Sequence, residues 1–159
     1  MNTQTMELKQ SGTNVVNESQ ILEQAAEILS KRTFGGQSFS SAEDTKTFLQ
    51  LKLGAYDREV FSMLLLDSQH RLLKYTELFF GTVNAASVYP REIVKATLAV
   101  NAAAVILAHN HPSGHSSPSL ADIAITKRIK KALSLIDVPV LDHIIVAEES
   151  VSFAQRGLI

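Results

Sequence analysis

The chain has 159 residues, of which 45% are hydrophobic and 19% are charged, as expected for one globular domain with its own core. Its 15 Lys and Arg nearly balance its 16 Asp and Glu, which argues against a strongly basic nucleic-acid binder. The absence of cysteine excludes disulfides, cysteine zinc sites and a cysteine nucleophile. Any metal ligands must therefore be histidines or carboxylates.

The N-terminal third of the chain is expected to contain a tail and two helices. Residues 1–17 show no hydrophobic periodicity and predict a flexible tail without the apolar core of a secretory signal. Residues 18–55 predict an N-terminal helical segment, because apolar residues recur at helical spacing from Ile21 to Leu29 and Ser41 is placed to cap a second helix. No stretch approaches the roughly 20 apolar residues of a membrane helix, so we expect a cytoplasmic protein without membrane contact.

Residues 56–159 predict a domain in which strands and helices alternate. Apolar runs predict strands over residues 59–67, 71–83, 103–111 and 138–149. The polar tetrad 68–71 makes the first two runs a hairpin, Pro90 suits the first turn of a helix, and Ser119 opens another. This order predicts an α/β fold with a mixed β-sheet flanked by helices.

Two histidines end the third of these apolar runs. His109 and His111 are two residues apart on the predicted strand, so both point to one face, about 6.5–7 Å apart along the chain. They can converge on one cation at Zn–N distances of about 2.0–2.1 Å, and Pro112 ends the strand pairing. Asp122 lies one turn into the helix that Ser119 opens, after a chain reversal that brings its carboxylate from another direction. Two histidines and a carboxylate leave the fourth position of a tetrahedral zinc for water.

Each part of this pattern also has a simpler interpretation. An H-x-H pair alone is weak evidence for a metal site. Ser119 and Asp122 also fit the S-x-x-D pattern of a helix capping box, in which Asp122 favours the first turn. Together, the strand-terminal H-x-H, the proline, the short turn and the helix-opening S-x-x-D form a specific arrangement that favours a metal site.

The run HNHPSGHSSPSLAD, residues 109–122, matches the JAMM motif of JAB/MPN-type metalloproteases, in which six residues separate H-x-H-P from S-x-x-D. More narrowly, residues 56–159 resemble the RadC-like JAB domain of bacteria through GTVNAASVYPREIVK, AHNHPSG, PSxxD and VLDHIIV. The resemblance implies a JAB/MPN-like (cytidine-deaminase-like) metalloprotease fold. It also implies His109, His111 and Asp122 as the ligands of one zinc ion per chain.

The resemblance further implies two catalytic residues. Ser119 would donate a hydrogen bond to the oxyanion of the tetrahedral intermediate, and an upstream glutamate would act as general base. The chemistry needs such a carboxylate, because a zinc-activated water must give up a proton that the leaving amine then receives. Spacing alone leaves Glu59, Glu77 and Glu92 open. The resemblance selects Glu59, at the head of the first core strand, where an exposed carboxylate without function is the simpler interpretation.

These residues predict a JAMM-type zinc metallohydrolase that cleaves a peptide or isopeptide bond in a peptide or protein substrate. The alternative is a DNA-repair-associated or protein-binding module that keeps the metal fold with little hydrolysis. RadC-like proteins often carry a helix-hairpin-helix DNA-binding region, whereas residues 18–55 lack a G-x-G hairpin between helices. A basic cluster after Asp122 could contact an acidic partner or the phosphates of a nucleic acid, although a solvated helix face is the simpler interpretation; its members are Lys127, Arg128, Lys130 and Lys131.

Polar residues around the motif are assigned smaller roles. Asn110 alternates to the face opposite the histidines and is expected to serve the loop, and His115 is expected to be a surface loop residue. Asp142 and His143, in the last predicted strand, could orient a metal ligand from behind. A buried, hydrogen-bonded pair with a purely structural role fits them as well.

Other metal hydrolases fit the sequence less well. A zinc deaminase needs a P-C-x-x-C element, a zincin needs H-E-x-x-H on a helix, and a barrel hydrolase needs about 250 residues. A metal-dependent nuclease finds no obvious second metal position among two histidines and one aspartate.

Overall fold

The computed structural model describes residues 17–34, 39, 41–81 and 87–159. The predicted flexible tail, residues 1–17, lies outside the described residues except for its last position. Within the described part of the chain, no helix is both long and apolar enough to cross a membrane.

A five-stranded sheet of order β2-β1-β3-β4-β5 forms the centre of the molecule. Its strands are β1 (Val60–Leu66), β2 (Leu72–Phe80), β3 (Ala104–Asn110), β4 (Val140–Val146) and β5 (Val151–Ser152). β1 pairs antiparallel with both β2 and β3, β3 pairs parallel with β4, and β4 pairs antiparallel with β5. The sheet is therefore mixed, which confirms the predicted α/β class and the predicted hairpin.

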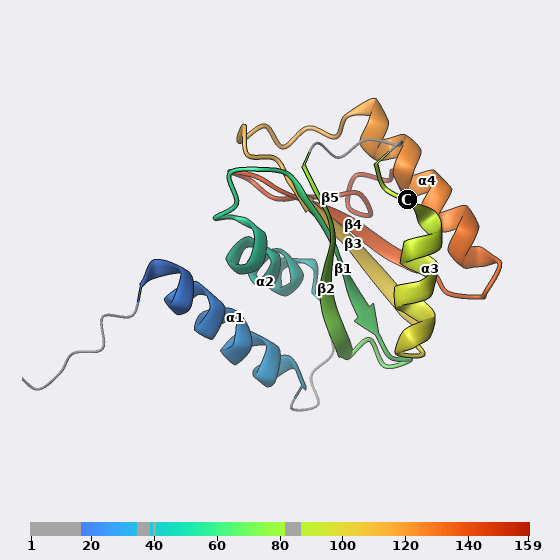
Figure 1. The fold of residues 1–159 in the computed structure, drawn as a ribbon, viewed down its shortest axis with the longest axis horizontal. Coiled ribbons are helices and arrows are strands. Elements are labelled where there is room, and N and C mark those ends of the chain that lie inside the picture. Colours follow the sequence, from blue (N-terminus) through green and yellow to red (C-terminus); the bar gives the residue numbers. More distant parts are fainter. Residues whose placement is uncertain (1–16, 35–38, 40, 82–86) are drawn as a thin grey trace, which may run out of the picture.

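Helices cover both faces of this sheet (Figure 1). They are α1 (Glu18–Phe34), α2 (Ala42–Leu53), α3 (Pro90–Ala99) and α4 (Leu120–Ser134). α2 packs on one face with α1 outside it, and α3 and α4 lie on the other face. Two buried clusters of apolar side chains result, one on each face of the sheet.

The helix starts follow the capping signals in the sequence. Ser41 caps α2 by accepting hydrogen bonds from the backbone N–H groups of Glu43 and Asp44, and Pro90 occupies the first turn of α3. Ser119 is the N-cap of α4. These caps fix where each helix begins, and at Ser119 this sets the position of the residues in the first turn of α4.

The apolar positions of α1 are only partly used for packing. Ala26 is fully buried, whereas Ile21 and Ile28 are 55% and 53% exposed. α1 contacts mainly α2, to which the Lys52 ammonium and the Glu23 carboxylate tie it at 2.5 Å. The helical spacing from Ile21 to Leu29 thus predicted the helix correctly but did not predict which of its apolar residues are covered.

The two central strands carry the functional motif into the core. β1 and β3 are buried along their full length, because helices cover both of their faces. Val105 and Leu107 of β3 belong to the cluster on the α3–α4 side. By the alternation of a strand, His109 points to that same side and Asn110 to the α2 side. Both are buried, at 0% and 3% exposure.

Candidate metal centre

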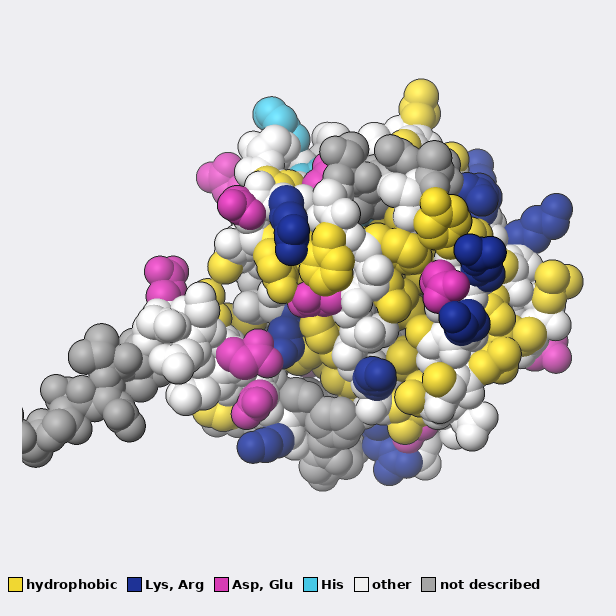
Figure 2. All heavy atoms as spheres, viewed as in Figure 1, with side chains coloured by type: hydrophobic (Ala, Val, Ile, Leu, Met, Phe, Trp, Pro, Cys, Tyr) yellow, Lys and Arg dark blue, Asp and Glu magenta, His cyan; other side chains and the backbone are white. Residues whose placement is uncertain are grey.

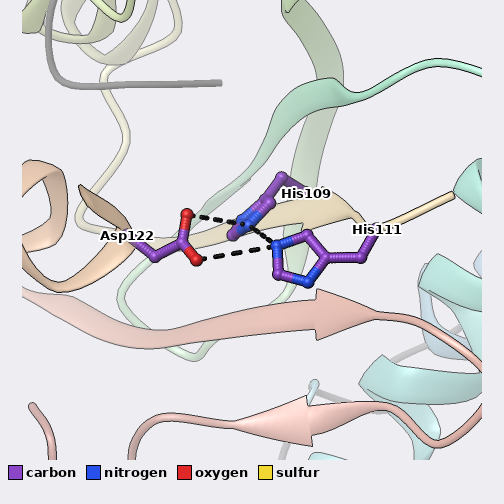
Figure 3. Close-up of side chains that lie close together, drawn as sticks. All are labelled: His109, His111 and Asp122. Carbon is purple, nitrogen blue, oxygen red and sulfur yellow. Dashed lines mark hydrogen bonds and ion pairs between the residues drawn. The ribbon is translucent and has the colours of Figure 1, made fainter. Parts of the chain in front are cut away.

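Three side chains from two adjoining elements converge at the end of β3 (Figure 3). His109 is the penultimate residue of β3, His111 follows the strand directly, and Asp122 lies in the first turn of α4. The two Nε2 atoms of His109 and His111 are 3.0 Å apart. One Asp122 oxygen lies 3.2 Å from Nε2 of His109, and the other lies 3.6 Å from Nε2 of His111.

These separations suit a shared metal ion. In a tetrahedral site with Zn–N distances of about 2.0–2.1 Å, neighbouring ligand atoms lie about 3.3 Å apart. The three contacts of 3.0, 3.2 and 3.6 Å bracket that value. The donor set of two imidazoles and one carboxylate also matches a catalytic zinc site with an open position. The group of His109, His111 and Asp122 can therefore hold a metal ion.

Asp122 takes part in the N-terminal cap of α4 and also faces the two histidines. Its Oδ2 accepts a hydrogen bond from the Ser119 N–H at 2.7 Å, and its own N–H donates to Ser119 Oγ at 3.1 Å. This is the capping box that the sequence offered as an alternative to the metal site. Burial raises the pKa of Asp122, but the nearby imidazoles of His109 and His111 and the hydrogen bond from the Ser119 N–H outweigh burial and hold that pKa well below its usual range. The carboxylate is therefore ionised and can ligate a cation.

His111 is oriented by the backbone of the turn that follows it. Its Nδ1 lies 2.7 Å from the carbonyl oxygen of His115. Because a carbonyl can only accept, His111 carries its proton on Nδ1, and in the neutral ring Nε2 is a lone pair facing Asp122. The His115 side chain is exposed, as expected for a surface loop residue. Its contribution to the site is its carbonyl.

Glu59 lies directly before β1, on the side of the sheet that carries the histidines. Phe61 is paired with His109 in the antiparallel register of β1 and β3. The same register, continued by two residues, sets Glu59 opposite His111, and opposed residues share a face. The Asp122 carboxylate beside its Nε2 is the main cause that raises the pKa of His111, and the negative charge of Glu59 raises it further. The structure thus brings Glu59 near the metal group, while its role as general base remains a prediction.

The two other glutamates that spacing left open have different surroundings. The Glu77 carboxylate accepts hydrogen bonds from the hydroxyls of Tyr56 and Tyr75, at 2.8 and 3.0 Å. Glu92 pairs with Lys95 at 3.2 Å on the surface of α3. Neither environment involves the metal group.

Asn110 holds the segment that carries Glu59. Its Oδ1 accepts from the Val60 N–H at 2.7 Å, and its Nδ2 donates to the Arg58 carbonyl at 2.9 Å and, with a longer contact of 3.4 Å, to the Tyr56 carbonyl. Asn110 does serve a loop, but not the loop of the motif that the sequence had suggested. The loop is the one before β1, distant in sequence from the motif.

Ser119, the N-cap residue of α4, lies beside the metal group. Its Oγ accepts from the Asp122 N–H, which leaves the hydroxyl proton for another acceptor. Ser119 is exposed, so a substrate can reach it. Its role as a donor to an oxyanion remains a prediction.

Of the two residues predicted to orient a ligand from behind, Asp142 and His143, only His143 contacts one. His143 Nε2 lies 2.8 Å from His109 Nδ1, so His143 contacts a candidate ligand directly. Asp142 instead accepts from the backbone N–H groups of His143 and Ala154, which is a structural role. Sequence reasoning missed Thr126, whose Oγ1 lies 2.6 Å from His143 Nδ1. Its only signal was the four-residue spacing from Asp122, which puts both on one face of α4.

The fold and the site together define an α/β domain with a His-His-Asp group fitted to hold a metal. The family model of the RadC-like JAB domain matches residues 39–158, which include α2 as well as the sheet. The chain is 59% identical over 140 residues to a UPF0758 protein of Vibrio cholerae, covering 88% of this chain and 89% of that protein. The chain belongs to the RadC-like JAB domain family.

Other relatives are longer than this chain. A UPF0758 protein of Marinomonas sp. is 54% identical, over 87% of this chain and 62% of its own length. A UPF0758 protein of Methylibium petroleiphilum is 56% identical, over 87% of this chain and 63% of its own length. The match thus spans about three-fifths of these two relatives.

Proposed function

We propose that this protein is a zinc-dependent hydrolase that cleaves a peptide or isopeptide bond, with His109, His111 and Asp122 as the metal ligands. The observation that carries the proposal is the convergence of three side chains, whose Nε2 atoms and carboxylate oxygens make contacts of 3.0 to 3.6 Å, next to a glutamate on the same face. A zinc ion bound there supplies Lewis acidity toward a water molecule and a substrate carbonyl.

Proton transfer and stabilisation of the oxyanion are assigned to side chains around the metal group. The Glu59 carboxylate accepts a proton from the attacking water and passes it to the leaving amine. The Ser119 hydroxyl donates a hydrogen bond to the oxygen that becomes negative in the tetrahedral intermediate. Asn110 keeps Glu59 in place through the segment before β1.

The burial of the ligands supports a site that opens in one direction. The His109 and Asp122 side chains are 0% and 3% exposed, whereas the His111 side chain is 14% exposed. A substrate therefore has access to the group from the His111 side.

An activity profile with peptide and isopeptide libraries tests this function. The zinc-loaded protein is compared with Glu59→Gln, which keeps the size of the side chain but cannot take up a proton. Glu92→Gln is the matched control, because Glu92 lies on the surface of α3. We expect cleavage by the wild type and by Glu92→Gln, and a loss of about 10²–10⁴-fold in Glu59→Gln at unchanged zinc content. Equal activity in all three proteins, or none in any of them with zinc bound, would refute the proposal.

A second candidate function is binding to a nucleic acid through α4. Lys127, Arg128, Lys130 and Lys131 are all exposed on this helix, and Figure 2 shows Lys and Arg side chains gathered over the side where α3 and α4 lie. Binding of duplex DNA that weakens steeply with salt, and that is lost when these four residues are changed to Ala, is the expected result. Binding that is unaffected by the four changes rules this surface out.

A further inference from the structure

His143 is a fully buried histidine that the proposed hydrolysis does not use. It lies on β4, next to β3 and beside the aromatic rings of Phe61 and Phe153, whose centroids are 5.7 and 4.7 Å from its own. Both of its ring nitrogens are engaged, Nε2 with His109 Nδ1 at 2.8 Å and Nδ1 with Thr126 Oγ1 at 2.6 Å. Thr126 Oγ1 in turn lies 2.6 Å from the backbone carbonyl oxygen of Asp122. A chain of hydrogen bonds thus connects α4, β4 and β3 behind the metal group.

The chemistry of the groups fixes the direction of every bond in this chain. The carbonyl of Asp122 can only accept, so the single hydroxyl proton of Thr126 points to it. Thr126 Oγ1 is then the acceptor for His143, which must carry a proton on Nδ1.

The second half of the chain follows from the neutrality of His143. His143 is fully buried beside the rings of Phe61 and Phe153, where a second ring proton would be a buried charge facing no carboxylate of the described residues, so the ring carries only one proton. That proton is on Nδ1, so His143 Nε2 is a lone pair that accepts from the Nδ1–H of His109. In the neutral His109 ring, Nε2 is therefore left without a proton, and it faces Asp122 and His111.

We propose that Thr126 and His143 are positioning residues that fix the tautomer and ring orientation of His109, so that its Nε2 lone pair is presented to the metal. The proposal rests on the proposed function only in that it takes the His-His-Asp group to be a metal site. The two ligands are then oriented by different means, His111 by the backbone carbonyl of His115 and His109 by two buried side chains. Hydrogen-bond partners of this kind hold a ligating histidine in one tautomer and raise its basicity.

The tautomers can be read directly in the metal-free wild-type protein. Long-range ¹H–¹⁵N correlation spectra of the imidazoles, recorded at a pH where the rings are neutral, distinguish Nδ1–H from Nε2–H. We expect Nδ1–H for both His109 and His143. Protonation of either ring on Nε2 would overturn the proposal. This readout needs no bound metal, so it judges the chain of hydrogen bonds even where zinc binding itself fails.

Variants of Thr126 test the consequence for metal affinity. Thr126→Val keeps the shape of the side chain and removes the hydroxyl, so His143 is no longer held in one tautomer. Thr97→Val is the matched control, because the Thr97 hydroxyl is equally buried in a helix and donates to the Ile93 carbonyl at 2.7 Å. Thr126→Ser restores the hydroxyl.

The measurement is the zinc dissociation constant by chelator competition, together with the visible absorption of the Co²⁺-substituted protein. Thr126→Val is expected to weaken zinc binding about 10–100-fold and to change the Co²⁺ spectrum, with recovery in Thr126→Ser and no change in Thr97→Val. Wild-type affinity in Thr126→Val, or an equal loss in Thr97→Val, would overturn the proposal. Absence of zinc from the wild type as well would refute the proposed function and leave the tautomer result to decide this inference.

Discussion

Replacing Asn110 with Ala should destabilise the protein and impair the segment that carries Glu59. The carboxamide is 3% exposed and makes three contacts with backbone groups of residues 56–60. The change removes all three without altering a metal ligand. The contact of 3.4 Å with Tyr56 is weak, so the loss concerns chiefly the Val60 N–H and the Arg58 carbonyl.

The expected cost follows from the burial of those two groups. Val60 is fully buried, so its N–H is left without a partner at a cost of about 1–3 kcal/mol. Arg58 is an exposed residue, so water can satisfy its carbonyl, and the net loss there is about 1 kcal/mol. The free energy of unfolding should fall by about 2–4 kcal/mol, which lowers Tm by roughly 5–15 °C in a chain of this size.

Thermal unfolding followed by circular dichroism, with and without zinc, measures this effect. Asn101→Gly is the control, because Asn101 is exposed and has a φ of 51°, which glycine adopts readily. Its Tm should stay close to that of the wild type. A Tm of Asn110→Ala within about 2 °C of the wild type would contradict the assigned contacts. Hydrolysis should fall more than zinc content, because Glu59 loses its support while the ligands stay.

Three further outcomes are expected. Asp122 raises the pKa of His111, so the metal-free protein loses that contribution to its stability as the pH rises from 6.5 through the raised pKa. Over the same range zinc binding strengthens, because fewer protons compete with the metal for His111. The Tm difference between the zinc-loaded and the metal-free protein should therefore grow with pH, and a constant difference would contradict this. Asp122→Asn keeps an acceptor for the Ser119 N–H but loses the charge, so chelator competition should show zinc affinity falling more than tenfold, a loss of more than about 1.4 kcal/mol, and an unchanged affinity would contradict the assignment of Asp122 as a ligand. Ser41→Ala removes the cap of α2 and should cost about 1 kcal/mol in denaturant unfolding at unchanged zinc affinity; an unaltered midpoint would show that the cap contributes nothing.

The sequence predicted the local elements well because their signals are local. Ser41, Pro90 and Ser119 mark helix starts through interactions within three residues, and the apolar runs mark strands. The order of the strands was not predicted, because pairing between β3 and β4 depends on contacts across more than thirty residues. The exposure of Ile21 and Ile28 was missed for a similar reason, since helical spacing shows an apolar face without showing what covers it.

The sequence left open whether Asp122 closes a capping box or faces the two histidines, and in the structure it does both. Asp122 closes a capping box through one oxygen and faces His109 with the other, so an ordinary helix start is what aims the carboxylate at the histidines. The surroundings of the group were harder to predict. Thr126 and His143 come together only because α4 packs over β4, and Asn110 reaches Val60 across the sheet from β3 to β1. No spacing rule within one element contains these contacts.

The central claim is that His109, His111 and Asp122 hold one metal ion. Elemental analysis of the purified protein, after exposure to zinc and removal of excess metal, tests it most directly beside His109→Ala. We predict one zinc per chain in the wild type and close to none in the variant, with circular dichroism showing that both are folded. A folded wild type without zinc, or equal zinc content in the two proteins, would contradict the account.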